Sequence, residues 1–98
     1  PLSDAFFAGG VRAYDDLKSD TVTIRSTKSE KTLTISAPGF PYWGFWMPEK
    51  GGAPFLCLEP WYGHADYADF DGEFAEKAGT QKLAPGKTFH AEYTITVG

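Results

Sequence analysis

Cysteine and histidine are scarce in this sequence of 98 residues. Its single cysteine, Cys57, cannot form an internal disulfide, and one cysteine with two histidines provides no cluster at the spacing of a metal site. We therefore expect no metal. We expect Cys57 to pack as a small buried hydrophobic residue.

Long apolar runs and clustered basic charge are lacking as well. No stretch approaches the roughly 20 apolar residues that span a bilayer, and the opening PLSDAFFAGG lacks the basic start of a secretory signal. This predicts a cytoplasmic protein with no membrane partner. Nine basic residues are scattered among thirteen acidic ones, for a net charge of −4. Phosphate binding needs clustered Lys and Arg, so the charge pattern excludes nucleic acid and favours a neutral ligand.

Aromatic residues, in contrast, make up 16% of the chain. A chain of this length forms one compact core at most, and that core must hide many rings. Two interpretations compete. Some rings stack on a flat ligand such as a sugar, or they pack against a part of the protein that is absent from this sequence.

Short alternating segments predict an all-β protein, an antiparallel β-sandwich. Residues 22–26 and 32–36 alternate apolar and polar side chains, and the polar stretch TKSEK joins them as a hairpin. Further strands are expected at 10–14, 42–47, 55–59 and 88–97. Residues 62–87 form a long connection, with one helical turn between Asp71 as its cap and Gly79 as its stop.

Two of these strands carry specific expectations about their faces. In residues 55–59, Glu59 should share a face with the apolar Phe55 and Cys57, and Pro60 should end or bulge the strand because it cannot donate to a central ladder. In residues 88–97, alternate side chains should face inward, namely Phe89, Ala91, Tyr93, Ile95 and Val97. His90 should then lie on the surface.

Glu59 is the candidate functional residue. A carboxylate that leaves an apolar strand beside Trp61 and Tyr62 is suited to act as a general base in a sugar site. The alternative is structural, because the same carboxylate could cap the turn at Pro60 or accept backbone N–H groups of the following loop. Trp61 is equally suited to stacking on a sugar and to packing.

The segment CLEPWYGHAD, preceded by GFPYWGFWMPEKGGAPF and followed by DGEFAEKAGTQKLAPGKTFHAEYTITV, resembles the C-terminal part of the aldose 1-epimerase (galactose mutarotase) family, in particular its bacterial galactose-mutarotase-related branch. The resemblance covers nearly the whole chain. It implies that residues 1–98 are a single β-domain, the C-terminal portion of a larger galactose-mutarotase-like β-supersandwich.

The resemblance also implies an activity. In that family the motif glutamate, which matches Glu59, takes the proton from the C1 hydroxyl of an aldose, while a histidine upstream of the matched region protonates the ring oxygen. No cofactor is needed. Trp61, His64 and Asp66 are the expected substrate-binding residues, although His64 could equally stabilise its turn and Asp66 could bond the loop backbone.

The expected partners are a sugar and the missing N-terminal part of the same fold or a companion chain, with a homo-oligomer as a further possibility. The isolated chain should show no measurable catalysis, since it supplies one of two proton-transfer groups. The alternative function is a non-catalytic carbohydrate-binding or structural β-sandwich module.

Overall fold

The structure is a computed structural model that describes residues 2–3, 5–48 and 54–98. Strands with alternating or apolar sequences dominate this part of the chain, as β-branched and aromatic residues favour. Their bounds are β1 Arg12–Tyr14, β2 Thr21–Arg25, β3 Thr32–Ser36, β4 Tyr42–Trp46, β5 Cys57–Trp61 and β6 Thr94–Val97. Two short 3-10 turns, η1 Ala5–Phe7 and η2 Phe74–Glu76, complete the described elements. Neither turn is long and apolar enough to cross a membrane.

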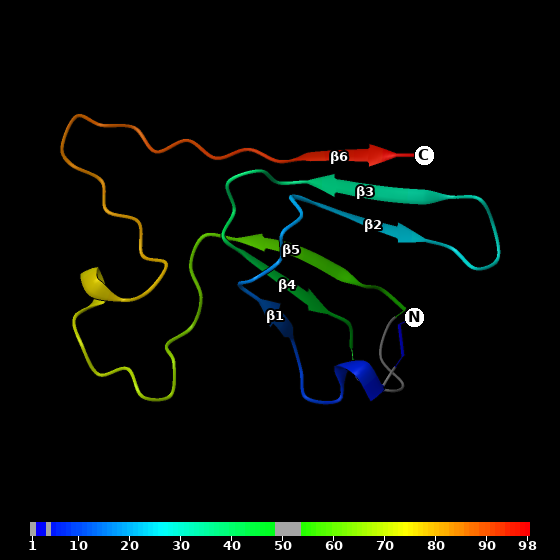
Figure 1. Cartoon of the computed structure of the whole chain (residues 1–98), viewed down its shortest axis with the longest axis horizontal. Coiled ribbons are helices and arrows are strands. Elements are labelled where there is room, and N and C mark those ends of the chain that lie inside the picture. Colours follow the sequence, from blue (N-terminus) through cyan, green and yellow to red (C-terminus); the bar gives the residue numbers. More distant parts are fainter. Residues whose placement is uncertain (1, 4, 49–53) are drawn as a thin grey trace.

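The strands form two antiparallel sheets. Sheet 1 has the order β1-β4-β5 and sheet 2 the order β2-β3-β6. Figure 1 shows the strands of the two sheets as two separate groups, with the connection from β5 to β6 extending to one side of both. The chain is therefore an all-β protein with a β-sandwich architecture, as the sequence predicts.

The core lies where the two sheets meet. Three buried residues form its centre: Ile35 of β3, Ala37 just after β3, and Trp43 of β4. Partly buried residues pack against them, namely Val22, Leu33, Phe40, Phe45 and Leu58. Trp43 stacks on Phe45, with 5.9 Å between ring centroids and 5° between ring planes. Apolar burial of this kind is the main favourable term in folding.

The register of β4 and β5 decides which residues point toward this core. Trp43 lies opposite Pro60 and Phe45 opposite Leu58, and these pairs face inward. The alternate pairs are Tyr42 with Trp61, Gly44 with Glu59, and Trp46 with Cys57. Because successive side chains point to opposite faces, these three pairs lie on the outer face of sheet 1.

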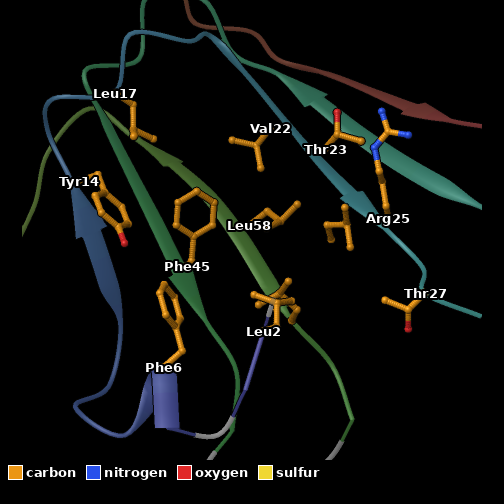
Figure 2. Close-up of a pocket in the computed structure, with 12 residues that line it drawn as sticks. Leu2, Phe6, Tyr14, Leu17, Val22, Thr23, Arg25, Thr27, Phe45 and Leu58 are labelled. Atoms are coloured by element: carbon orange, nitrogen blue, oxygen red, sulfur yellow. The ribbon is translucent and has the colours of Figure 1, made fainter.

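The sheets diverge toward one side and enclose an open apolar cavity of about 890 Å³. Figure 2 shows Phe45 and Leu58 of sheet 1 and Val22 of sheet 2 around this space, with Tyr14 of sheet 1 at its side. Arg25 and Thr27 lie at its polar end. The cavity is thus an incompletely filled part of the space between the sheets.

The prediction that the strand ends or bulges at Pro60 is wrong. β5 continues through Pro60 to Trp61, and Pro60 is in register with Trp43. In the described part of the chain β5 is the edge of sheet 1, and an edge strand tolerates a residue that lacks an N–H. The proline therefore lies within the strand that carries Glu59.

The expected burial of the last strand is also wrong. β6 is shorter than predicted and exposed along its whole length, with Ile95 53% and Val97 80% exposed. Ile95 lies opposite the buried Ile35, so the apolar face of β6 does continue the core face of sheet 2. Nothing in the described part of sheet 1 extends far enough to cover it.

An aromatic cluster links the segment before β6 to sheet 1. Phe40 packs against Tyr62 with ring centroids 4.5 Å apart, and against Tyr93 at 6.5 Å, while Tyr62 meets Phe89 at 5.0 Å. These contacts tie the start of β4, the end of β5 and the approach to β6 together. Phe89 and Tyr93 nevertheless stay 46% and 56% exposed, which corrects the prediction that they are buried.

Three smaller expectations can be compared with the structure. The helical turn predicted between Asp71 and Gly79 is present as η2, but its cap is Glu73 rather than Asp71. Cys57 is half-buried on the outer face of sheet 1 and not fully buried. His90 is exposed, as predicted, and lies 3.5 Å from Glu92.

Candidate functional site

Glu59 is positioned by the alternation of β5. Leu56 and Leu58 line the cavity between the sheets, so Glu59, one residue further, points to the opposite face. Its cross-strand partner on β4 is Gly44, which has no side chain to fill the space beside the carboxylate. The apolar strand thus places a half-buried glutamate over a gap in the outer face of sheet 1.

Trp61 fills that gap. Its indole ring lies over Gly44 so closely that a Cβ at position 44 would come within 2.7 Å of Cε2 and nearer still to Cζ2. From this position the indole Nε1–H of Trp61 donates a hydrogen bond to Oε2 of Glu59, at 3.0 Å. Residues two apart on a strand share a face, which makes this contact possible.

The carboxylate keeps one oxygen available. The hydrogen bonds formed among the described residues use Oε2 of Glu59 and leave Oε1 without a partner. One face of the indole rests on Gly44, so the other face is directed away from the sheet. A carboxylate oxygen beside an aromatic face can accept a proton from a hydroxyl group whose carbon skeleton stacks on the ring.

Tyr42 extends this arrangement along the outer face. It lies directly opposite Trp61 on β4, and its ring meets the His64 ring edge-on at 4.8 Å. Gly79 is folded against the same tyrosine, because a Cβ at position 79 would lie 3.0 Å from Cε2 of Tyr42. Gly79 has φ +81°, a left-handed conformation that favours glycine.

His64 is half-buried between two tyrosines. Besides Tyr42, Tyr67 packs against its ring at 4.6 Å. Nδ1 of His64 is hydrogen-bonded to the carbonyl oxygen of Ala65, while Nε2 is buried and has no hydrogen-bond partner in the described part of the chain. The contact with Ala65 agrees with a turn-stabilising role for His64.

Asp66 points away from Glu59 toward the long connection. Its Oδ1 lies 2.9 Å from Nζ of Lys77, and its side chain is 60% exposed whereas that of Lys77 is 17% exposed. An ion pair with one partner mostly exposed contributes little stability. Its geometric effect is to join the loop after β5 to Lys77, a residue that lines a small pocket together with His64.

The structure therefore brings together three of the four predicted site residues on the outer face of sheet 1, namely Glu59, Trp61 and His64. Asp66 reaches the group only through Lys77. Sequence reasoning did not single out Gly44, Tyr42 or Lys77. A glycine inside the apolar run YWGFW is the signal that could have identified Gly44, since glycine within a strand often marks a close approach of another group.

Glu59 does not line the large cavity between the sheets, which is lined by Leu58 of β5 and by Leu56 just before that strand. The carboxylate and the cavity lie on opposite faces of sheet 1. Any ligand of Glu59 would therefore bind on the outer face and not within the sandwich. Among the described residues, no three His, Cys, Asp or Glu side chains are grouped so as to hold a metal ion.

Comparison with known proteins identifies two relatives in Lactococcus lactis subsp. lactis, Protein LacX, chromosomal, and Protein LacX, plasmid. Each is 32% identical to this chain over 96 residues. The match covers 98% of this chain and 32% of each relative, so the chain spans about a third of the length of the curated relatives it matches. No protein-family profile matches the chain, and no solved structure does. The comparisons therefore show a distant similarity to LacX proteins along almost the entire chain.

Proposed function

We propose that this chain is the part of an aldose 1-epimerase-like protein that carries the general base, and that Glu59 is that base. The observation that carries the proposal is the Glu59–Trp61 pair. An indole N–H holds one carboxylate oxygen at 3.0 Å, the other oxygen is unpartnered among the described residues, and an aromatic face lies beside it. The distant similarity to LacX and the EPWYG-AD motif are consistent with this proposal.

The proposed reaction is the interconversion of sugar anomers. Oε1 of Glu59 accepts the proton of the C1 hydroxyl while an acid protonates the ring oxygen, and the bond between C1 and the ring oxygen breaks to give the open-chain aldehyde. Rotation about the C1–C2 bond exposes the other face of the carbonyl group. Reclosure reverses both proton transfers and regenerates both catalytic groups.

The acid comes from outside these residues in this proposal. The neutral form of His64 that donates from Nδ1 to Ala65 carries no proton on Nε2, so this nitrogen can accept but not donate. His90 is exposed and lies 3.5 Å from Glu92. The chain alone should therefore not accelerate anomerisation, whereas the chain completed by a polypeptide that supplies the acid should.

The proposal includes a domain larger than residues 1–98. The accessible surface of the chain is 7679 Å², against about 5,500 Å² for a compact monomer of this mass. Its radius of gyration is 16.2 Å, against about 13 Å for a compact domain of this length. The exposed surface includes features that a longer fold would cover, such as the apolar face of β6 and the open cavity between the sheets.

We propose that these surfaces are covered by further polypeptide, equivalent to the two thirds of a LacX protein that this chain does not match. That polypeptide belongs either to the same chain or to a companion chain. A second copy of this chain is the alternative outcome. Apolar strand faces that are this exposed mark an interaction surface in soluble proteins.

Glu59→Gln tests the catalytic part of the proposal, in the chain co-expressed with a polypeptide that completes the fold. The amide keeps the size of the side chain and removes its basicity. We expect the anomerisation rate of galactose to fall about 10²- to 10⁴-fold, while galactose affinity measured by calorimetry stays within about fivefold, since one hydrogen bond is worth about 1 kcal/mol. A rate unchanged by Glu59→Gln would refute the base assignment.

A non-catalytic sugar-binding module is the second candidate, and one observation favours it. Glu59 accepts a hydrogen bond from the Trp61 indole and so holds that ring in place. A glutamate with a purely structural role in a sugar-stacking surface would make the same contact. Under this reading galactose binds, Trp61→Ala abolishes binding, and no completed form of the protein accelerates anomerisation. The co-expression experiment separates the two candidates.

A further inference from the structure

β6 is an edge strand whose outer side has no partner in the described part of the chain. It pairs with β3 alone, and Figure 1 shows no described segment on its other side. Thr32 of β3 and Gly98 exchange both of their backbone hydrogen bonds, at 3.2 and 3.0 Å. Bonded and non-bonded pairs alternate along an antiparallel ladder, so the N–H and C=O groups of Ile95 and Val97 point away from β3. Unpaired backbone groups of this kind can template the addition of another strand.

The other edges of the two described sheets carry features that hinder strand addition. β1 is only three residues long, and β5 contains Pro60, which has no N–H to offer. On β2 the backbone N–H and C=O of Thr21 are both hydrogen-bonded to the Ser19 hydroxyl, at 3.1 and 2.9 Å, and the strand ends with the charged Arg25. Short strands, proline and charge are the usual means of protecting an edge. β6, with the sequence TITV, has neither proline nor charge, and Gly98 extends its pairing by one residue.

The two faces of β6 define the kind of strand that fits beside it. Ile95 lies opposite the buried Ile35, so Ile95 and Val97 lie on the core face of sheet 2, although they are 53% and 80% exposed. The two threonines of β6 alternate to the other face. A matching strand therefore has apolar side chains beside Ile95 and Val97 and polar side chains on its opposite face.

A second copy of this chain fits this edge less well than a larger polypeptide does. Pairing two copies through β6 would join the edges but would leave Ile95 and Val97 uncovered, because the described part of sheet 1 does not reach them. So short a strand pair also buries far less than the roughly 1,200–2,000 Å² of a stable interface. The unmatched part of the LacX relatives is about two thirds of their length. Polypeptide of that size can pair with the edge and cover the apolar face together.

We propose that a strand of the polypeptide that completes the fold is added to β6, hydrogen-bonded to the N–H and C=O groups of Ile95 and Val97, so that sheet 2 continues across the junction. The inference rests on the proposed function. It adds that the completing polypeptide is held by backbone pairing at a defined edge, and not by apolar contact with a face alone.

Hydrogen exchange of the backbone amides, followed by NMR, tests the inference. The probe is the part of chromosomal LacX that this chain does not match, co-expressed with the complete chain of 98 residues. In the chain alone we expect the Ile95 and Val97 amides to exchange freely and the Thr96 amide, which points toward β3, to be protected. In the complex, exchange at Ile95 and Val97 should slow at least about 100-fold, because paired strand amides exchange only through local unfolding.

Val97→Pro removes the outward N–H and leaves the hydrogen bonds to β3 intact. Pro60 in β5 shows that an edge strand of this protein accommodates a proline. The matched control is Val97→Thr, which loses the same apolar contact and keeps the N–H. We expect Val97→Pro to weaken the complex at least about fivefold more than Val97→Thr, the effect of one lost hydrogen bond. Protection of the Thr96 amide in the isolated variant checks that it stays folded.

Ile95 and Val97 amides that exchange as fast in the complex as in the free chain overturn the inference, and so does the absence of a complex. Protection of these amides in the concentrated free chain would place a second copy at the edge and also overturn it. Failure of the proposed function is a separate result. An unprotected edge in a complex whose mutarotation is lost in Glu59→Gln refutes the strand addition alone, and a protected edge in a complex that does not anomerise sugar refutes the base assignment alone.

Discussion

At the scale of single residues, the site depends on a glycine. Gly44 gives the Trp61 indole a flat surface to rest on, and in that position the indole N–H reaches Glu59. Any side chain at position 44 would occupy the place of the ring. The orientation of the Glu59 carboxylate thus depends on Trp61, which donates a hydrogen bond to it, and on Gly44, which leaves space for the Trp61 ring.

Gly44→Ala should displace Trp61 and break its hydrogen bond to Glu59. Adding a methyl group to a filled site costs about 1–3 kcal/mol in the free energy of unfolding, which urea denaturation measures. The indole N–H resonance of Trp61 should shift at the same time. Gly9→Ala is the control, because a Cβ at position 9 meets nothing within 4 Å. A Gly44→Ala variant as stable as the wild type, with an unmoved Trp61 resonance, would contradict the account.

The placement of Glu59 could be predicted from sequence, because side chains alternate with a period of two and Phe55, Cys57 and Glu59 follow it. The contact with the indole of Trp61 follows from the same period. What the pattern did not predict is that this face is the outer one, away from the cavity between the sheets. Which face of a strand is covered depends on the neighbouring sheet, and a local pattern carries no information about it.

At the scale of elements, most strands could be located from their alternation, whereas their ends and their burial could not. β2 and β3 form the expected hairpin, with Val22 opposite Ile35. β5 extends past Pro60 because it lies at the edge of its sheet, a property of topology. β6 alternates apolar and polar residues as a buried strand would, yet its covering partner is missing from the described fold.

The two neighbours Ile35 and Ile95 allow a prediction about β6. Ile35 is 6% exposed and Ile95 is 53% exposed, although they lie opposite each other in one sheet. Ile35→Ala should destabilise the isolated chain by about 2–5 kcal/mol, or prevent it from folding. The exposed Val97→Thr should change the stability of the isolated chain by less than about 0.5 kcal/mol.

The same Val97→Thr change should weaken the assembly of the chain with the polypeptide that completes the fold, because that polypeptide covers β6 in this account. Size-exclusion chromatography of the co-expressed pair measures this effect. If Val97→Thr destabilised the isolated chain as strongly as Ile35→Ala, β6 would already be covered within the chain itself, and the proposed interface would be wrong.

At the scale of the whole molecule, the chain is less compact than its length predicts, with a radius of gyration of 16.2 Å against about 13 Å for a compact domain. Its extents of 50 × 30 × 24 Å and its small buried core belong to two sheets that diverge instead of closing on each other. Many of the aromatic rings lie half-exposed at the cavity, in the segment before β6 and around Glu59. Sequence composition indicated the surplus of rings, and the structure shows where they gather.

Small-angle scattering of the isolated chain tests this description. The account predicts that the isolated chain either stays a monomer with a radius of gyration near 16.2 Å or associates through its apolar surfaces. We expect these residues to belong to a compact particle only when the completing polypeptide is bound. A lone monomer with a radius of gyration near the roughly 13 Å of a closed domain would show that residues 1–98 form a finished fold.

The central claim is that the Glu59 carboxylate takes a proton from a sugar hydroxyl. Its most direct measurement is the time course of optical rotation of freshly dissolved α-galactose with the completed protein, comparing Glu59→Gln with Glu92→Gln, a glutamate that is exposed beside His90. The account predicts fast mutarotation for wild type and Glu92→Gln, and a rate at least about 100-fold lower for Glu59→Gln. Equal rates for the two variants would contradict it.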